Sequence, residues 1–202
     1  MTLNEAVWDP LVRIGHWTIV AAFAIAYFTE DDLLTLHVWA GYTVGAVVVI
    51  RIAWGFVGPA RARFSDFIYA PRTIIAYLSD LARLRGRRYL GHSPAGGAMV
   101  VALLAMLTAT VVTGLMTYGA DKKAGPLATF YTAGEPLPSA SLDGSHKPAE
   151  ESAIREVHDL LADLTLVLVL VHVAGVALAS VVHHENLVRA MITGRKRTDT
   201  AH

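Results

Sequence analysis

Four long apolar stretches limit what this chain can fold into more than any other feature. They cover residues 11–28, 37–57, 95–118 and 158–182. Each is close to the length of about 17–25 residues that a helix needs to cross a membrane. A segment in lipid must satisfy its own backbone hydrogen bonds, so we predict four transmembrane helices. The third stretch carries no charge, which argues against a soluble four-helix bundle.

The composition agrees with a membrane protein and excludes several other classes. Of the 202 residues, 54% are hydrophobic and only 17% are charged, and the mean hydropathy is +0.45. A net charge of +0 gives no basic field of the kind that nucleic-acid binders use. With no cysteine, the chain has no disulfide, iron–sulfur cluster, catalytic thiol or covalently attached c-type haem. We therefore predict one all-α integral membrane domain over residues 1–202.

The basic residues predict the orientation of the four spans. They gather in the second loop and the C-terminal tail, whereas the first loop holds three acids and no base. Because cytoplasmic loops carry an excess of Lys and Arg, both termini and the second loop are expected in the cytoplasm. The basic residues are Arg61, Arg63, Arg72, Arg83, Arg85, Arg87, Arg88, Arg189, Arg195, Lys196 and Arg197, and the acids are Glu30, Asp31 and Asp32.

Two regions between the spans have features of their own. Residues 71–85 begin with a proline and place Ile74, Ile75, Leu78, Leu81 and Leu84 on one helical face. This pattern predicts a short helix on the inner membrane surface, with a soluble lid helix as the alternative. The third loop, residues 119–157, is rich in Pro, Gly and Ser, and loops this long are usually disordered or used for docking.

Four histidines fall at two matched depths of the predicted bundle. His37 and His158 open the second and fourth spans at the outer side. His172 follows His158 by 14 residues, which is about 3.9 helical turns and about 21 Å, so both rings leave nearly the same face. His16 lies at the inner end of the first span, at the depth of His172. Ionisable residues at membrane depth are usually functional.

Each depth thus holds two imidazoles from two different helices, which suits bis-histidine ligation of two haems inside a bundle. One alternative is that the histidines only hydrogen-bond between helices. A zinc or di-iron site fits less well, because no span carries the Glu-x-x-His pattern. The chain also shows no P-loop and no GxGxxG motif, so we predict no catalytic residue.

Two residues of the second span are candidate cofactor-binding residues. Arg51 lies 14 residues after His37 and therefore faces the same way, at the inner depth. A haem propionate or a quinone carbonyl would give it a partner; the alternative is that it reaches the inner headgroups. Gly41, one turn after His37, leaves room for a flat macrocycle, although with Gly45 it also forms a small-xxx-small packing pattern.

Two further histidines at the inner side complete the candidates. His92, before the third span, could face an inner haem or a quinone, or simply cap the helix. His183 is 11 residues after His172 and nearly in phase with it. It could replace a ligand, touch a propionate or move protons, or it could share a structural, interfacial role with His184.

These residues resemble those of the bacterial cytochrome b561 group and of the b-type cytochrome subunits of nickel–iron hydrogenases. The resemblance runs from RIGHW, around His16, to the final MITGRKR, and includes RIAWGFVGPARARFSDF and YLGHSPAGG. It implies a four-helix cytochrome b of a bacterial inner membrane with two b-type haems. His16 and His172 would hold the inner haem, and His37 and His158 the outer one.

The resemblance also implies electron transfer between a periplasmic partner and the quinone pool. A hydrogenase-like subunit or a cytochrome c would dock on the outer loops, where Glu30, Asp31 and Asp32 suit a basic carrier. The tandem His183 and His184 and the long third loop favour such a dedicated partner. The alternative is a stand-alone quinone-linked enzyme that acts on a small molecule such as superoxide. The sequence therefore does not decide whether the protein is an enzyme. It also leaves a homodimer open. A non-haem transporter or a structural subunit is more distant, since no span contains a proline or an inverted repeat.

Overall fold

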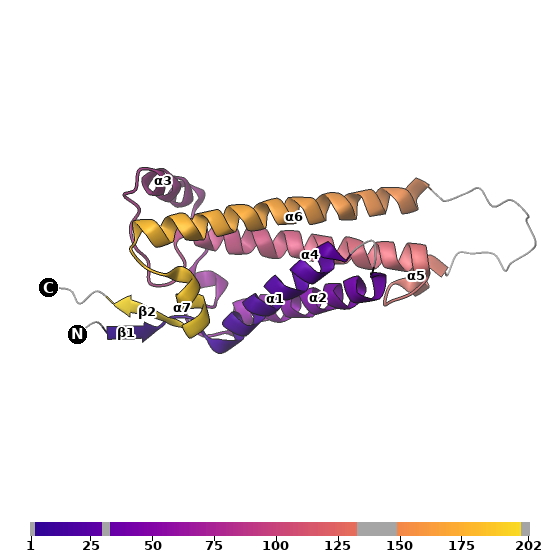
Figure 1. Ribbon diagram of the computed structural model, residues 1–202, viewed down its shortest axis with the longest axis horizontal. Coiled ribbons are helices and arrows are strands. Elements are labelled where there is room, and N and C mark those ends of the chain that lie inside the picture. The colour runs from indigo at the N-terminus through magenta and orange to yellow at the C-terminus, as the bar shows by residue number, and fades with distance from the viewer. Residues whose placement is uncertain (1–2, 30–32, 133–148, 199–202) are drawn as a thin grey trace, which may run out of the picture.

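A computed structural model of the chain describes residues 3–29, 33–132 and 149–198. Four of its helices are long and apolar enough to cross a membrane, which confirms the predicted all-α membrane bundle (Figure 1). They are α1 (Pro10–Phe28), α2 (Leu34–Val57), α4 (Pro94–Lys122) and α6 (Ala149–Val182).

Local signals in the sequence set where two of these helices begin. Asp9 caps α1 by accepting a hydrogen bond from the Val12 amide at 3.1 Å, and Pro10 follows as the first helical residue. Ser93 and Pro94 do the same for α4. At the other end of the molecule, α4 runs on past the predicted span and α6 starts before it. The third loop is therefore shorter than predicted, and it includes the short helix α5 (Ala128–Thr132).

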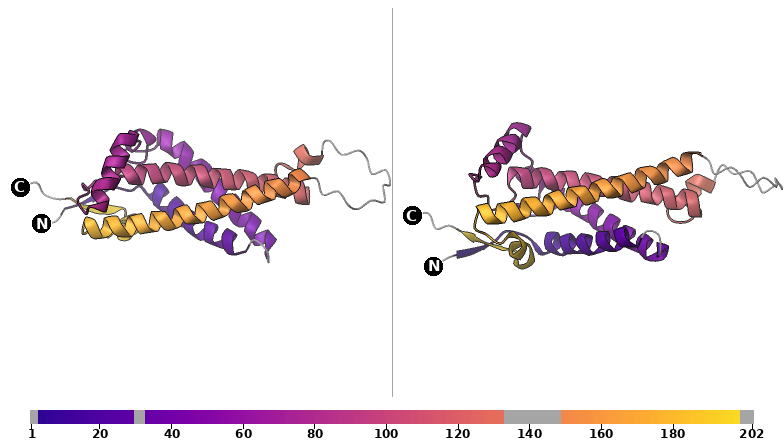
Figure 2. Two further views of the ribbon diagram at one scale, coloured as in Figure 1. Left: turned by 90° about the horizontal axis from the view of Figure 1, so that it is seen from above. Right: turned by 45° about the horizontal axis from the view of Figure 1, so that its top comes forward.

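The long helices form two pairs. Within the described residues, α1 packs along α2 and α4 packs along α6, and the two pairs meet mainly through α2 and α4. Helices α1 and α6 make little or no backbone contact with each other within the described residues. Figure 2 shows the two pairs from two further directions. The small core lies where α1, α2 and α4 meet, and consists of Ala22, Val44, Val48, Leu104 and Leu107.

The outward faces of the long helices are apolar. Val49 on α2 is 67% exposed and Leu170 on α6 is 59% exposed, and many other large apolar side chains of the spans are exposed as well. Such a surface is unfavourable in water and favourable against lipid chains.

The predicted helix after the second span is present as α3 (Pro71–Ala82), which follows a short 3-10 turn η1 (Phe64–Asp66). The helix is shorter than predicted: it ends at Ala82, and Leu84, which we predicted on its apolar face, lies beyond it with a positive φ of 58°. Tyr77 and Leu81 of α3 are buried, whereas Ile75 and Leu78 are exposed. In Figure 2 the helix lies at the end of the bundle that holds the termini. Its place on the membrane surface stays a prediction.

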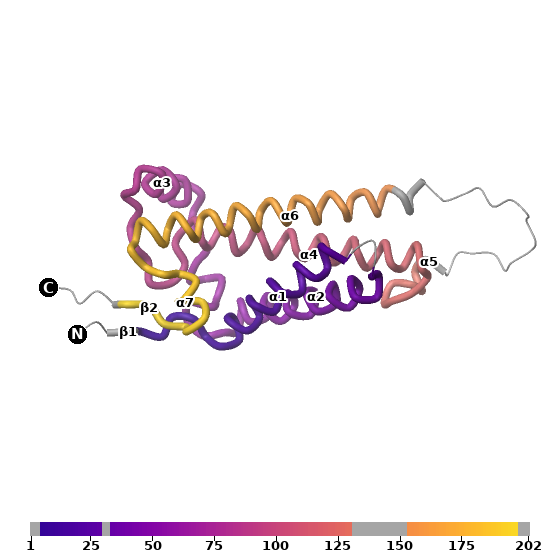
Figure 3. Tube along the Cα trace, viewed as in Figure 1, coloured from indigo at the N-terminus to yellow at the C-terminus, as the bar shows by residue number. Residues whose placement is uncertain are grey.

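The two chain ends meet, which the sequence did not predict. Strand β1 (Leu3–Ala6) pairs antiparallel with β2 (Arg195–Thr198), with Leu3 opposite Thr198 and Ala6 opposite Arg195. The short helix α7 (Leu187–Thr193) precedes β2. Both termini thus lie at one end of the bundle, as the tube in Figure 3 makes clear. This agrees with both termini being on one side of the membrane, and the basic residues remain the basis for assigning that side to the cytoplasm.

Candidate metal centres between facing histidines

The outer pair of histidines faces across α2 and α6. The ring centroids of His37 and His158 are 6.1 Å apart, with the ring planes at 86°. The Nδ1 of His37 lies 2.9 Å from the Ala26 carbonyl, and the Nδ1 of His158 lies 3.0 Å from the Thr110 carbonyl. A carbonyl only accepts, so each Nδ1 carries the proton and each Nε2 keeps its lone pair free for a metal.

Helix α4 shapes the space around His158. The Thr113 hydroxyl is 3.2 Å from the His158 Nδ1. A Cβ at Gly114 would stand 2.9 Å from the Cε1 of the same ring, so any larger residue there would displace it. Further along, Thr165 of α6 is fully buried and its hydroxyl lies 3.2 Å from that of Thr110. Hydroxyl groups of α4 and α6 therefore hold the two helices in register beside the histidine.

The inner pair faces across α1 and α6. The ring centroids of His16 and His172 are 6.4 Å apart, with the planes at 59°. The His16 Nδ1 is buried and has no hydrogen-bond partner among the described residues. A Cβ at Gly15 would lie 3.2 Å from Val47, so α1 and α2 are already in close contact beside this pair. The inner pair is thus less fixed by hydrogen bonds than the outer one.

Both separations fit one metal ion held between two imidazoles. A metal–nitrogen bond of about 2 Å to each ring, together with the size of the two imidazoles, would bring the ring centres to about 6 Å from each other. The structure gives 6.1 Å and 6.4 Å. Within residues 3–29, 33–132 and 149–198, no three His, Asp or Glu side chains gather as a bare ion would require. A pair suits a metal whose other positions a macrocycle fills.

A cavity adjoins the outer pair. It has a volume of about 90 Å³ and is lined mainly by apolar and aromatic residues of α1, α2, α4 and α6. Gly41 lines it, and a Cβ added there would meet nothing within 4 Å. At Gly45, by contrast, a Cβ would come within 3.0 Å of Val111. Gly45 is therefore the packing glycine, and Gly41 borders open space beside His37.

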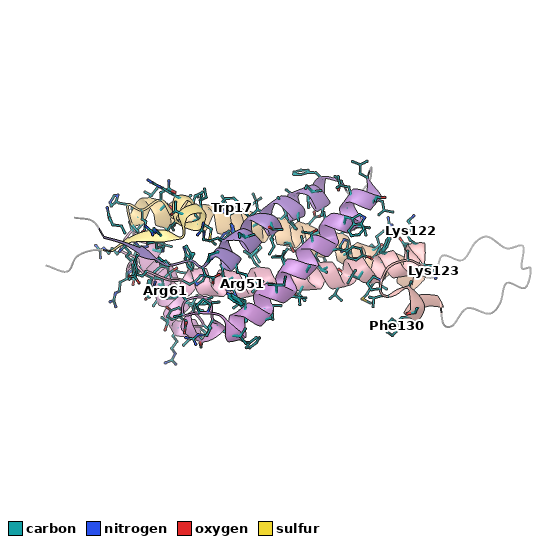
Figure 4. The ribbon with its side chains drawn as sticks, turned by 90° about the horizontal axis from the view of Figure 1, so that it is seen from below. Trp17, Arg51, Arg61, Lys122, Lys123 and Phe130 are labelled. Atoms are coloured by element: carbon teal, nitrogen blue, oxygen red, sulfur yellow. The ribbon has the colours of Figure 1, made fainter. Side chains whose placement is uncertain are left out.

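Arg51 lies inside the bundle, toward the end that holds the termini (Figure 4). Only 9% of its surface is exposed, and its guanidinium stands 5.7 Å from the ring centre of Phe64 and 5.8 Å from that of Phe67. Its Nη1 is buried and has no hydrogen-bond partner among the described residues. Burial on this scale does not fit the alternative in which the side chain extends to the lipid headgroups.

His92 packs against Phe67, the same ring that Arg51 contacts. Its ring centre is 4.6 Å from that of Trp8 and 4.4 Å from that of Phe67. Burial, together with the positive charges of Arg51 and Lys196, lowers the pKa of His92 to about 3. The ring is therefore neutral at physiological pH, and its buried Nδ1 has no partner in the described part of the chain.

His183 contacts the peripheral helix α3. Its Nε2 lies 3.4 Å from the Tyr77 hydroxyl, a hydrogen bond that joins the end of α6 to α3. Burial is the main cause that lowers the pKa of His183. His184 is exposed and has a positive φ of 48°. These contacts favour the structural interpretation of His183, while a cofactor-binding role for it stays a prediction.

Several residues around these histidines were not singled out from the sequence. Some of them have a recognisable sequence pattern, namely hydroxyl residues within an uncharged span or an Asp before a Pro at the start of a helix. Others lie in distant loops and have no such pattern. The residues are Trp8, Asp9, Phe64, Phe67, Thr110, Thr113, Gly114 and Thr165. The acidic residues proposed for docking, Glu30, Asp31 and Asp32, lie outside the described residues.

Two facing histidine pairs inside a four-helix membrane bundle define a class: multi-pass membrane proteins that hold a metal cofactor between helices. The family model for prokaryotic cytochrome b561 matches residues 7–194, and the chain belongs to this family. It is therefore a haem b electron-transfer protein of the bacterial inner membrane. No curated protein and no solved structure matches the chain.

Proposed function

We propose that the chain holds two b-type haems, one between His37 and His158 and one between His16 and His172. Electrons would pass along the membrane normal between a periplasmic partner and the quinone pool. The observation that carries this proposal is the presence of two histidine pairs with nearly equal centroid separations, 6.1 Å and 6.4 Å. Their members on α6 lie 14 residues apart, about 21 Å along the helix.

The haem supplies one-electron redox chemistry when bound, and the protein supplies ligands and their orientation. Two imidazoles at each site would hold the haem iron and leave no open position for oxygen, which favours electron transfer over oxygen binding. The hydrogen bonds from Nδ1 of His37 and His158 to backbone carbonyls fix the tautomer and the direction of each ring. Fixed ligands limit how much the site must rearrange when it gains or loses an electron.

Arg51, His92 and Gly41 complete the proposed cofactor contacts. Arg51 offers a buried N–H group to an oxygen that is anionic or strongly polarised, either a haem carboxylate or a quinone carbonyl. His92, whose neutral ring shares the Phe67 contact with Arg51, offers a second polar atom at the same end of the bundle. Gly41 borders the cavity beside the outer pair and leaves its volume to the macrocycle.

The partner remains the one that the family resemblance suggests, either a hydrogenase-like subunit or a cytochrome c. It would dock at the end of the bundle opposite the termini. The described residues at that end include Lys122, the exposed Phe130 and an ion pair of 2.6 Å between Arg155 and Asp121 (Figure 4). This surface carries charges of both signs and would not by itself attract a basic partner. Attraction of a basic partner would have to come from the three acidic residues of the first loop.

Haem content and reduced-minus-oxidised spectra test the proposal directly. We expect two low-spin haems per chain in the wild type, and one in each of His158→Ala and His172→Ala, with a different haem lost in the two variants. His184→Ala removes an exposed histidine and should keep both haems. If His158→Ala keeps both haems unchanged, the ligand assignment is wrong.

A short-chain quinol should reduce the wild-type haems, and a lack of reduction would remove quinone from the proposal.

A further inference from the structure

The chain ends form a unit that holds the inner end of the bundle together. We call it the terminal clasp and define it as residues 3–9 together with residues 185–198. It includes β1, β2 and α7, and it lies beside the start of α1 and the end of α6 (Figure 1). Nothing in the proposed electron path uses these residues.

The terminal clasp lies between α1 and α6, two helices that, in the described part of the chain, do not pack directly along each other. Helices α1 and α6 make little or no backbone contact within the described residues. Yet His16 on α1 and His172 on α6 face each other with 6.4 Å between their ring centres. Something other than α1–α6 packing must therefore set the position of His16 relative to α6.

The C-terminal segment contacts α1 within one helical turn of His16. The guanidinium of Arg13, three residues before His16, donates a hydrogen bond of 2.5 Å to the Ile192 carbonyl of α7. Just before α1, the amides of Val7 and Trp8 both donate to the Gly194 carbonyl, at 2.8 Å and 3.1 Å. The start of α1 is thus bonded to the segment that directly follows α6.

Gly194 is the residue on which this contact depends. It ends α7 with a positive φ of 79°, and its amide donates to the Ala190 carbonyl at 2.8 Å. A Cβ at this position would lie 2.7 Å from Nη1 of Arg13 and 2.9 Å from the Trp8 carbonyl oxygen. Both the backbone conformation and the close approach therefore require glycine.

Side-chain contacts fasten the clasp to the segment before α4. Arg88 pairs with Glu185 at 3.0 Å, and these side chains are 19% and 9% exposed. The Lys196 ammonium donates to the Tyr89 carbonyl at 3.3 Å. The clasp therefore connects α1 and the end of α6 to the segment that leads into α4, and α4 in turn packs against α6.

We propose that the terminal clasp is a positioning device for the inner metal centre, in which Arg13 and Gly194 set where His16 stands relative to His172. This inference rests on the proposed function, because it takes His16 and His172 as the inner haem ligands. The outer pair does not need the clasp, since His37 and His158 are fixed by carbonyls of α1 and α4.

The test compares the two haems within one protein. Gly194→Ala and Arg13→Ala should shift the midpoint potential and the low-spin EPR signal of one haem, or remove it, and that haem is the one lost in His172→Ala. The haem lost in His158→Ala should keep its potential and signal. Arg13→Lys retains a cationic donor. Its inner haem should therefore differ less from the wild type than that of Arg13→Ala does. Arg189→Ala changes an exposed side chain of α7 and should leave both haems unchanged.

Each other outcome has a defined meaning. If His172→Ala loses one haem and Gly194→Ala leaves that haem unchanged, the clasp inference is wrong and the proposed function stands. Equal changes in both haems would show that the clasp only stabilises the whole fold, which also overturns the inference. If His172→Ala keeps both haems, the proposed ligand pair itself has failed.

A second measurement follows the clasp without any haem. Ala6 and Arg195 are exposed partners in the β1–β2 register, and the chain has no native cysteine. The double variant Ala6→Cys/Arg195→Cys should form a disulfide readily, and adding Gly194→Ala should lower the yield several-fold. An equal yield would show that the clasp is intact without the glycine and would remove Gly194 from the inference.

Discussion

Each histidine of the outer pair is held by a main-chain carbonyl, and the Thr113 hydroxyl adds a side-chain contact to His158. His37 bonds to the Ala26 carbonyl and His158 to the Thr110 carbonyl. No substitution at positions 26 or 110 removes a carbonyl, so these bonds depend on the helices being in place and not on the identity of two residues. The rings of His37 and His158 would therefore change orientation mainly through a shift of the helices that carry these carbonyls.

His92 should make the stability of the protein depend on pH. Its pKa is about 3 in the folded protein, against an ordinary value of 6.5. Between these values the unfolded chain binds one more proton, so the free energy of unfolding falls as the pH drops through this window, by at most about 5 kcal/mol. We expect His92→Gln to show a shallower fall of the thermal unfolding midpoint between pH 7 and 4 in detergent.

The exposed His184 provides the control for this experiment. His184→Gln should follow the wild-type pH profile. If the profile of His92→Gln runs parallel to that of the wild type, His92 is not the buried neutral group described here.

The facing of the four histidines could be predicted at the residue scale because helical phase and membrane depth are both readable from spacing. The same argument from helical phase, applied to the 14 residues between His37 and Arg51, predicted that the Arg51 side chain points into the bundle. The surroundings of His92 could not be predicted, because Trp8 and Phe67 reach it from distant segments that carry no periodic pattern. Likewise, spacing does not show which carbonyl a ring will meet.

At the scale of elements, α3 should depend on its buried side chains for attachment to the bundle. Leu81 is 6% exposed, whereas Ile75 is 67% exposed. Leu81→Ala should remove about 2–5 kcal/mol of packing and let the segment open. We expect faster tryptic cleavage after Arg83, Arg85 or Arg87 in vesicles, measured by peptide mass.

The matched variant Ile75→Ala should leave that cleavage rate close to the wild-type rate, because its side chain makes little contact inside the protein. Similar acceleration in both variants would mean that α3 is held through lipid contact on its exposed face and not through Leu81.

The centres of the elements could be predicted better than their ends. Hydropathy finds the apolar middle of a span, but α6 begins at Ala149 among charged residues that hydropathy excludes. Strands β1 and β2 have four residues each and pair across the whole length of the chain. Nothing in either segment alone specifies that partner.

At the scale of the whole molecule, the arrangement of charges predicts the direction of insertion. Lys122 and Arg83 lie near opposite ends of the bundle, and both are exposed. In a chain without cysteine, Lys122→Cys should react with a membrane-impermeant maleimide in spheroplasts, and Arg83→Cys only after the cells are opened. The unsubstituted protein gives the background. The reverse labelling pattern would place the termini outside.

The pairing of α1 with α2 and of α4 with α6 has a consequence for how the protein is made. Each proposed haem site takes one histidine from the first helical pair and one from α6, the last long helix to be synthesised. Because a chain is made from its N-terminus, neither site is complete until α6 has entered the bilayer. Cofactor insertion is then a late step of biogenesis, and a truncated chain that stops after α4 would hold His16 and His37 without partners.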